Sequence, residues 1–282
     1  MQITRGFTAL LLGVGAILPA LTACIDNGNH PTGPRVADND ARASAAKLDD
    51  GTTRIKHNVR VVSASGDITT AVGTYRTLLG ALNPNVAGEQ PGGRREINWD
   101  GVPIGFTNND LFPGNFFNVT SPRGVLFTTP GTGFHNTGQG FIEVNPQYDG
   151  EFNTFSPTKL FVARGSTIID VQFVVAGSNT PATVTGFGSV FADVGRAHST
   201  TIEYFDALGR SLLTVAAPRA SDATGLSFVG AVFASRVVGR VRITAGDTPI
   251  DASVVDNVKK AGKKRDLVAT DDFIYGEPRA SK

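Results

Sequence analysis

The chain is poor in the residues from which disulfides, metal centres and many active sites are built. Its 282 residues include one cysteine, one tryptophan, one methionine and four histidines. A lone cysteine excludes an intrachain disulfide, so the folded part must be stable without one. A chain of this length can be, because it buries most of its apolar surface when it folds.

Sequence signatures of several enzyme classes are also missing. The chain has no Gly-x-Ser-x-Gly elbow and no His-x-x-x-His spacing. Its histidines are scattered: they are His30, His57, His135 and His198. This inventory argues against a zinc centre. We therefore expect a protein that is not an enzyme, with carboxylate chemistry as the remaining catalytic alternative.

The N-terminus has the pattern of an export signal. Arg5 precedes an apolar run from Gly6 to Ala20, which is too short for a membrane span and is typical of a signal-peptide core. The run ends in Leu21-Thr22-Ala23-Cys24, which resembles the bacterial lipobox. The resemblance implies cleavage after residue 23 and diacylglycerol on Cys24. The alternative is an ordinary signal peptide with a chance cysteine, although a free thiol is unusual in an oxidising compartment.

Lipidation would place the mature protein at a membrane surface. Two or three acyl chains on Cys24 anchor a protein durably, whereas one does not. We therefore expect a lipid-anchored protein of the cell envelope that faces the periplasm or the cell surface. Ile25, which follows the cysteine, favours the outer membrane over retention in the inner membrane.

Neither sign of charge is in excess. The formal net charge is +1, and removal of the leader with Arg5 leaves 25 basic and 25 acidic residues. Nucleic acids and other acidic polymers need a positive field on their partner. We expect no nucleic-acid partner.

The distribution of polar and apolar residues along the chain predicts a tether followed by a β-rich domain. Residues 24–54 contain the lipidated cysteine and then few large apolar residues, so we expect a disordered tether. Asp67 to Leu82 has apolar residues at helical spacing, with Asp67 placed to cap the helix. The remaining candidate strands are 55–62, 125–129, 141–144, 160–162, 167–175, 182–191, 199–205, 211–216, 226–233, 237–244 and 267–275.

Many short strands without alternating helices predict an all-β fold of the β-sandwich or jelly-roll kind, with one short N-terminal helix. The sequence leaves open whether it is one unit or two packed β lobes, one over residues 55–180 and one over 181–282.

Several sequence blocks resemble a group of uncharacterised secreted bacterial proteins, some of which carry a PEP-CTERM sorting signal. The blocks are Gly93-Arg94-Arg95-Glu96-Ile97-Asn98-Trp99-Asp100-Gly101, Phe116 to Val125 with Thr129 to Phe134, Thr185 to Gly188, Val190 to Val194, and Asp271-Asp272-Phe273-Ile274-Tyr275-Gly276-Glu277-Pro278. The chain itself lacks the sorting signal. The resemblance implies secretion and brings no established activity.

Acidic residues around Trp99 are the first candidates for a ligand site. On a strand, Glu96, Asn98 and Asp100 would share one face and Trp99 would lie on the other. Such a face could bind a sugar, and Glu96 with Asp100 could act as the carboxylate pair of a glycan or ester hydrolase. The alternative is that Arg94, Arg95 and Glu96 form local ion pairs and that Trp99 belongs to the core.

A structural Ca²⁺ ion is the second candidate site. Calcium binds carboxylates and carbonyl oxygens, and β-sandwich modules often hold it near their last strand. Asp271 and Asp272 lie on the last candidate strand, and Asp193 follows another. Because neighbours on a strand face opposite ways, we expect only one of the two adjacent aspartates to bind from the sheet side.

The basic run and the aromatic composition of the sequence concern possible lipid and glycan partners. The basic run Lys259 to Arg265 is either a solvated loop or a contact to anionic lipid headgroups. Eighteen phenylalanines against four tyrosines and one tryptophan suggest that aromatic residues serve the core, which weakens the case for a glycan ligand without excluding it. The predicted function is therefore an envelope protein that binds an extracellular ligand, such as a glycan, or has a structural role.

Overall fold

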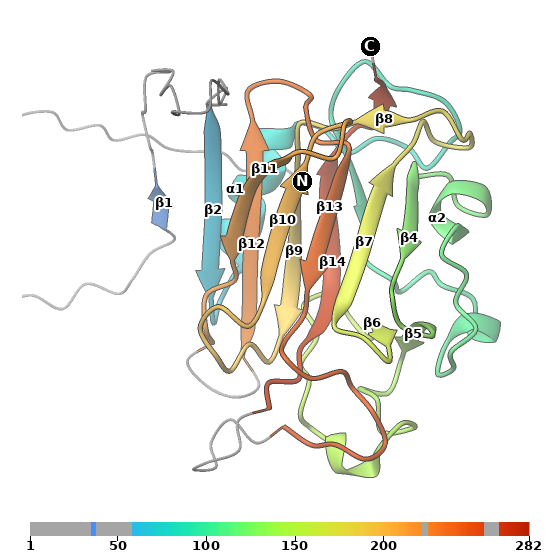
Figure 1. The fold of residues 1–282 in the computed structure, drawn as a ribbon, viewed down its shortest axis with the longest axis vertical. Coiled ribbons are helices and arrows are strands. Elements are labelled where there is room, and N and C mark those ends of the chain that lie inside the picture. Colours follow the sequence, from blue (N-terminus) through green and yellow to red (C-terminus); the bar gives the residue numbers. More distant parts are fainter. Residues whose placement is uncertain (1–34, 38–57, 221–224, 257–264, 282) are drawn as a thin grey trace, which may run out of the picture. The chain divides into compact units, whose positions relative to one another are not determined.

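A computed structural model describes residues 35–37, 58–220, 225–256 and 265–281, which belong to one compact unit, Pro34–Lys282 (Figure 1). Cys24 with its leader lies outside the described residues, and so does most of the basic run 259–265. Among the described residues, no helix has the length and apolar character that crossing a membrane requires.

The first of two antiparallel sheets has eight strands. In spatial order they are β1 (Arg35–Ala37), β2 (Val59–Ser65), β12 (Leu226–Phe233), β9 (Gly186–Ala192), β14 (Ala269–Gly276), β6 (Leu160–Arg164) and β5 (Gly133–Thr137), with β3 (Arg94–Ile97) paired to β14. Strands β9 and β14 are buried along their whole length. This burial reflects their central place, with packed residues on both faces of the sheet.

The second sheet has five strands and an open outer face. Their order is β11 (Ser211–Ala216), β10 (Thr201–Phe205), β13 (Arg240–Thr244), β7 (Ile168–Phe173) and β4 (Val125–Thr128). Side chains alternate along β13: Val241 and Ile243 are buried, while Arg240 and Arg242 both pair with Asp170. Strands β8 (Ala182–Thr183) and β15 (Arg279–Ala280) pair as a separate two-stranded sheet.

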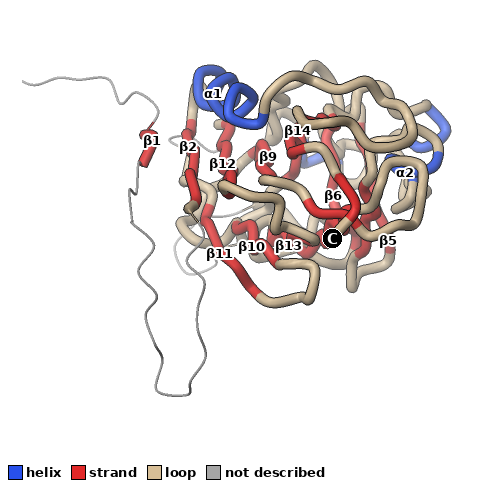
Figure 2. Tube along the Cα trace, turned by 90° about the horizontal axis from the view of Figure 1, so that it is seen from above, coloured by secondary structure: helices blue, strands red, loops and turns tan. Residues whose placement is uncertain are grey.

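The two sheets pack together, which confirms the predicted all-β sandwich. Helix α1 (Thr69–Leu79) lies on the face of the first sheet that points away from β10, β11 and β13 (Figure 2). As expected, the Asp67 carboxylate accepts the Thr69 N–H, at 3.0 Å, at the start of this helix. The other helices are short: α2 (Phe116–Val119), η1 (Ile104–Phe106) and η2 (Pro146–Tyr148).

Three hydrophobic clusters fill this architecture. The largest lies between the sheets and is centred on Trp99, which stacks on Phe161 with ring centroids 3.9 Å apart. The second lies between α1 and the first sheet and includes Tyr75 and Phe228. The third packs loops against the ends of β6, β9 and β14; its members are Phe141, Tyr148, Phe152, Leu160, Val162, Ala192, Ile250, Leu267 and Ala269.

Local details differ from the prediction. Phe141–Val144 forms turns and no strand, because the Thr137 hydroxyl accepts the N–H groups of Gln139 and Phe141 and ends β5 there. Strands β3 and β5 were not predicted. Three residues of the predicted tether form β1, which pairs with β2 at the edge of the sheet.

The boundary considered at residue 180 does not divide the sheets. Strands β2, β3, β5 and β6 precede it, yet they share the first sheet with β9, β12 and β14. The second sheet likewise combines β4 and β7 with β10, β11 and β13. The layers of this fold are therefore sheets and not halves of the sequence.

Candidate metal centre

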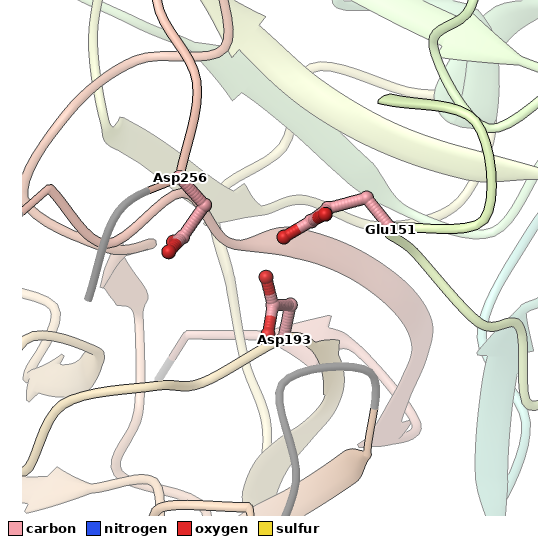
Figure 3. Close-up of side chains that lie close together, drawn as sticks. All are labelled: Glu151, Asp193 and Asp256. Carbon is pink, nitrogen blue, oxygen red and sulfur yellow. The ribbon is translucent and has the colours of Figure 1, made fainter. Parts of the chain in front are cut away.

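Three acidic side chains converge where β9 ends and β14 begins. Glu151 lies in the loop after η2, Asp193 directly follows β9, and Asp256 lies in the loop that precedes β14 (Figure 3). One carboxylate oxygen from each lies within 4.8 Å of the others. Among the described residues, this is the group of acidic side chains with the geometry to hold a metal ion.

Apolar neighbours in sequence explain why these three loops meet. Each acid lies close to residues of the third hydrophobic cluster: Tyr148 and Phe152 flank Glu151, and Ala192 precedes Asp193. Val254 packs on the same cluster two residues before Asp256. Burial of the apolar side chains thus brings the carboxylates to one place.

Hydrogen bonds hold two of the loops together. The Tyr148 hydroxyl lies 2.7 Å from the carbonyl oxygen of Asp251 and 2.9 Å from that of Val254. The Asn145 amide donates to the carbonyl oxygens of Ala252 and Val254, at 3.3 and 3.1 Å. These contacts limit how far Glu151 and Asp256 can separate.

Asp193 is the most enclosed of the three acids. It is 1% exposed, and its Oδ2 atom has no hydrogen-bond partner among the described residues. The pKa of Asp193 is raised to about 9, chiefly by burial and then by the negative charges of Asp256, Glu151 and Asp266 and a hydrogen-bonding contact with the Glu151 side chain. An ionised Asp193 therefore needs a positive charge beside it.

The acidic residues near Asp193 have hydrogen-bond partners for some of their carboxylate oxygens. Asp256 Oδ2 accepts the N–H of Leu267 at 3.0 Å. Asp266 accepts the N–H groups of Gly195 and Arg196 as well as the Ser199 hydroxyl, and the Arg196 guanidinium pairs with Asp247. The three-carboxylate donor set is suited to hard cations such as Ca²⁺, Mg²⁺ or Mn²⁺.

The predicted calcium ligands are divided between two places. Asp193 belongs to the acidic cluster, but Asp271 and Asp272 are not members of it. The Asp271 carboxylate accepts the Phe155 N–H at 2.6 Å and the Ser156 hydroxyl at 3.0 Å, while Asp272 pairs with Arg76 at 3.3 Å. Both aspartates of β14 thus have protein partners of their own, although Asp272 Oδ1, like Asp193 Oδ2, has no hydrogen-bond partner among the described residues.

The expectation that the adjacent aspartates face opposite ways is wrong. The register of β14 against β9 shifts between Thr270 and Phe273, so Asp271 and Asp272 occupy a bulge. Both carboxyl groups lie within hydrogen-bonding reach of Ser156 and of each other. Burial and this proximity raise the pKa of Asp271 to about 8, and burial raises that of Asp272 to about 6.

Glu96, Asn98 and Asp100 do not share a strand face, because β3 ends at Ile97. Glu96 accepts two hydrogen bonds from Arg76, at 2.9 and 2.7 Å, and one from Arg94 at 2.5 Å. These ion pairs lower the pKa of Glu96 despite its partial burial. Asp100 accepts the Lys159 N–H at 3.2 Å, and the side chain of Asn98 is exposed. Trp99 is 1% exposed and belongs to the core, as the structural alternative predicted.

Sequence reasoning missed Glu151 and Asp256. Neither was part of a motif considered in the sequence, and 105 positions along the chain separate them. The only signal was indirect: each is followed or preceded within a few residues by apolar side chains in a turn-rich segment.

Comparisons with known proteins assign no family. No family model matches the chain, and no curated protein matches it. The enzymatically active domain of tailspike protein 4 from bacteriophage CBA120 aligns with 48% of this chain and 20% of that chain, at 13% identity and a TM-score of 0.16. A similarity this low supports no argument about fold or function.

Proposed function

We propose that this protein is an exported, lipid-anchored protein of the cell envelope whose β-sandwich is not catalytic and binds an extracellular ligand or has a structural role. The observation that supports the non-catalytic assignment is the environment of Glu96, whose carboxylate is shared between Arg76 and Arg94. A carboxylate paired in this way is a poor general acid, because the ion pairs favour its charged form.

The separate contacts of Glu96 and Asp100 support the same assignment. Their partners differ, since Glu96 contacts arginines from α1 and β3 while Asp100 contacts the backbone at Lys159. A glycoside hydrolase needs two carboxyl groups that flank one bond. These two acids serve separate structural contacts.

The lipid anchor rests on the sequence Leu21-Thr22-Ala23-Cys24. A labelled fatty acid supplied to cells that express the full chain tests it directly. We expect the wild type to incorporate the label and to fractionate with membranes, and Cys24→Ala to lose both properties. Label retained by Cys24→Ala would contradict the anchor.

Hydrolysis of glycans or esters is the competing function. It is tested with chromogenic glycosides and esters on the wild type, Glu96→Gln and Asp100→Asn. We expect no turnover by any of them, and a glycan-binding panel then addresses the ligand. Turnover by the wild type that either substitution abolishes without lowering the melting temperature would overturn the non-catalytic assignment.

We also propose that a cation, Ca²⁺ on the sequence prediction, serves the sandwich as a structural cofactor. The convergence of three acidic residues near the ends of β9 and β14 supports it. A structural ion would suit a domain that has no disulfide to connect its loops.

A further inference from the structure

We propose that Glu151, Asp193 and Asp256 bind one Ca²⁺ ion, which connects three loops at the end of the sandwich where β9 ends and β14 begins. The proposal rests on the proposed function only for the assignment of a structural cation. The lipid anchor and the absence of catalysis stand or fall independently of it.

The orphaned oxygen of Asp193 is the observation that distinguishes this cluster from a chance gathering of acids. Buried carboxylate oxygens are almost always paired, because an unpaired one loses its hydration without replacement. The Asp193 side chain is 1% exposed, and its Oδ2 atom accepts no hydrogen bond from a donor group among the described residues. The neighbour within hydrogen-bonding reach of its carboxyl group is another acid, Glu151, which has no proton to donate when it is ionised. Figure 3 shows the Asp193 carboxylate directed into the space between Glu151 and Asp256.

The charges around Asp193 also indicate that a cation belongs in this cluster. The strongest electrostatic influences on Asp193 come from Asp256, Glu151 and Asp266, and all three are acidic. Three carboxylates within 4.8 Å repel one another unless a positive charge lies among them. A cation bound by the three oxygens would remove the repulsion and supply Asp193 Oδ2 with its missing partner.

Ligand chemistry favours Ca²⁺ over other cations. The three ligands are carboxylate oxygens, with no thiolate or imidazole among them, which disfavours zinc and copper. Oxygens on opposite sides of Ca²⁺ are about 4.6 to 5.2 Å apart, and the corresponding distance for Mg²⁺ is roughly 4.1 Å. Separations within 4.8 Å are compatible with Ca²⁺. Ca²⁺ also accepts six to eight oxygens in flexible geometry, whereas Mg²⁺ demands near-ideal octahedral geometry, so carboxylates from three loops suit Ca²⁺ better.

The bound ion would reinforce contacts that already exist. Hydrogen bonds from Tyr148 and Asn145 connect the loop of Glu151 to the loop of Asp256, and their acceptors do not include Asp193. Calcium would add the end of β9 to this connection. We therefore expect the ion to raise the stability of the whole domain, because β9 is a central strand.

Calorimetric titration and thermal melting of the full chain in detergent test the site, with Ca²⁺, with Mg²⁺ and with a chelator. We expect one Ca²⁺ per chain and a melting temperature several degrees higher in Ca²⁺ than in chelator. Asp193→Asn and Glu151→Gln should abolish both the binding and the shift. In chelator at neutral pH, Asp193→Asn should melt no lower than the wild type, because the amide replaces a carboxyl group that is protonated when no cation is bound.

Asp149→Asn is the matched control, since Asp149 is exposed in the same loop as Glu151 and lies outside the cluster. It should bind Ca²⁺ like the wild type. A wild type without a Ca²⁺-dependent shift, or an equal shift in Asp193→Asn, would overturn the proposal and would leave a shared proton as the partner of Asp193. A melting temperature that Mg²⁺ raises as much as Ca²⁺ does would contradict the assignment of the ion as Ca²⁺. Fatty-acid labelling of the same preparations shows separately whether the anchor holds.

Discussion

At the residue scale, Tyr75 shows how little space the packing of α1 leaves. Its ring lies over Gly188 of β9 and Gly230 of β12, which face each other in the ladder, and its hydroxyl donates to the Ala231 carbonyl oxygen at 3.1 Å. A Cβ atom on Gly230 would come within 2.7 Å of the Tyr75 ring and 2.9 Å of the Gly188 backbone. The two glycines thus make room for an aromatic side chain, which replaces the contacts that they lack.

Gly230→Ala should therefore destabilise the protein by about 1 to 3 kcal/mol, since the ring and a neighbouring strand must both move. Chemical denaturation followed by circular dichroism measures the free energy of unfolding. The control is Gly73→Ala in α1, where an added Cβ has open space around it and alanine favours the helix. A control variant less stable than Gly230→Ala would show that the steric account is wrong.

Asp271 and Asp272 make stability depend on pH at the residue scale. Their pKa values in the folded protein, about 8 and about 6, lie above the usual value for aspartate in an unfolded chain, about 3.9. Folding is then favoured by protonation, so the contribution is fully present below the unfolded pKa and is lost as the pH rises through the folded values.

We expect the free energy of unfolding, measured in chelator, to fall between pH 5 and pH 9. Asp271→Asn should make this fall smaller, because an amide keeps the shape of the side chain without titrating. Asp193 also has a raised pKa and should account for a fall that remains. An unchanged pH profile in Asp271→Asn would mean that the aspartate pair does not titrate as described.

At the element scale, two of the sequence blocks that suggested a protein group form a single structural unit. Strand β3 pairs with β14 from Arg94–Gly276 to Ile97–Phe273. The Trp99 indole donates to the Asp271 carbonyl oxygen at 2.7 Å, and Arg95 makes two hydrogen bonds to Glu277, at 2.6 and 2.8 Å. Both partners of this ion pair are buried, with side chains 0% and 1% exposed.

Arg95 also donates to backbone carbonyl oxygens of the segment between α1 and β3. The acceptors are Pro84, Val86 and Gly88, with Pro122 from the segment before β4. A turn-rich segment with few apolar residues is thus positioned by one guanidinium group. The arginine is structural, and its burial depends on the countercharge of Glu277.

Glu277→Gln should cost about 3 to 5 kcal/mol of stability, because it leaves the buried charge of Arg95 without compensation. Thermal or urea unfolding measures the loss. Glu89→Gln is the matched control: Glu89 lies 3.7 Å from Arg279 in a pair that is 35% and 37% exposed. It should cost at most about 1 kcal/mol. Equal losses in the two variants would contradict the role assigned to burial.

At the scale of the whole molecule, both sheets combine strands from the two sequence halves. In the first sheet, β12, β9 and β14 from the second half lie between β2 on one side and β6 and β5 on the other, which come from the first half. The core between the sheets likewise combines Trp99 and Phe161 with Phe273 and Val229. Neither half could bury its apolar face without the other.

Unfolding should accordingly be cooperative across the domain. Trp99 is the single tryptophan and lies between the sheets, so its fluorescence reports on their packing, while far-ultraviolet circular dichroism reports on the strands. We expect the two signals to give coincident urea transitions. Separate transitions would indicate lobes that unfold independently.

The sequence by itself determined the fold class, the short N-terminal helix with the Asp67 hydrogen bond at its start, and most strands, because these follow from local periodicity and turn residues. It also indicated a core position for Trp99 as one of two alternatives. It did not identify β3 and β5, which are short and contain charged or polar residues such as Arg94 and His135. Their pairing with β14 and β6 decides that they are strands.

Tertiary structure alone decided which acidic residues meet. Glu151, Asp193 and Asp256 are far apart in sequence and converge because their apolar neighbours share one cluster. The bulge in β14 likewise turned Asp271 and Asp272 toward one serine against the ordinary alternation of a strand. Long-range packing selects such contacts through the burial of apolar side chains, and a local pattern of charges contains no record of which loops that burial brings together.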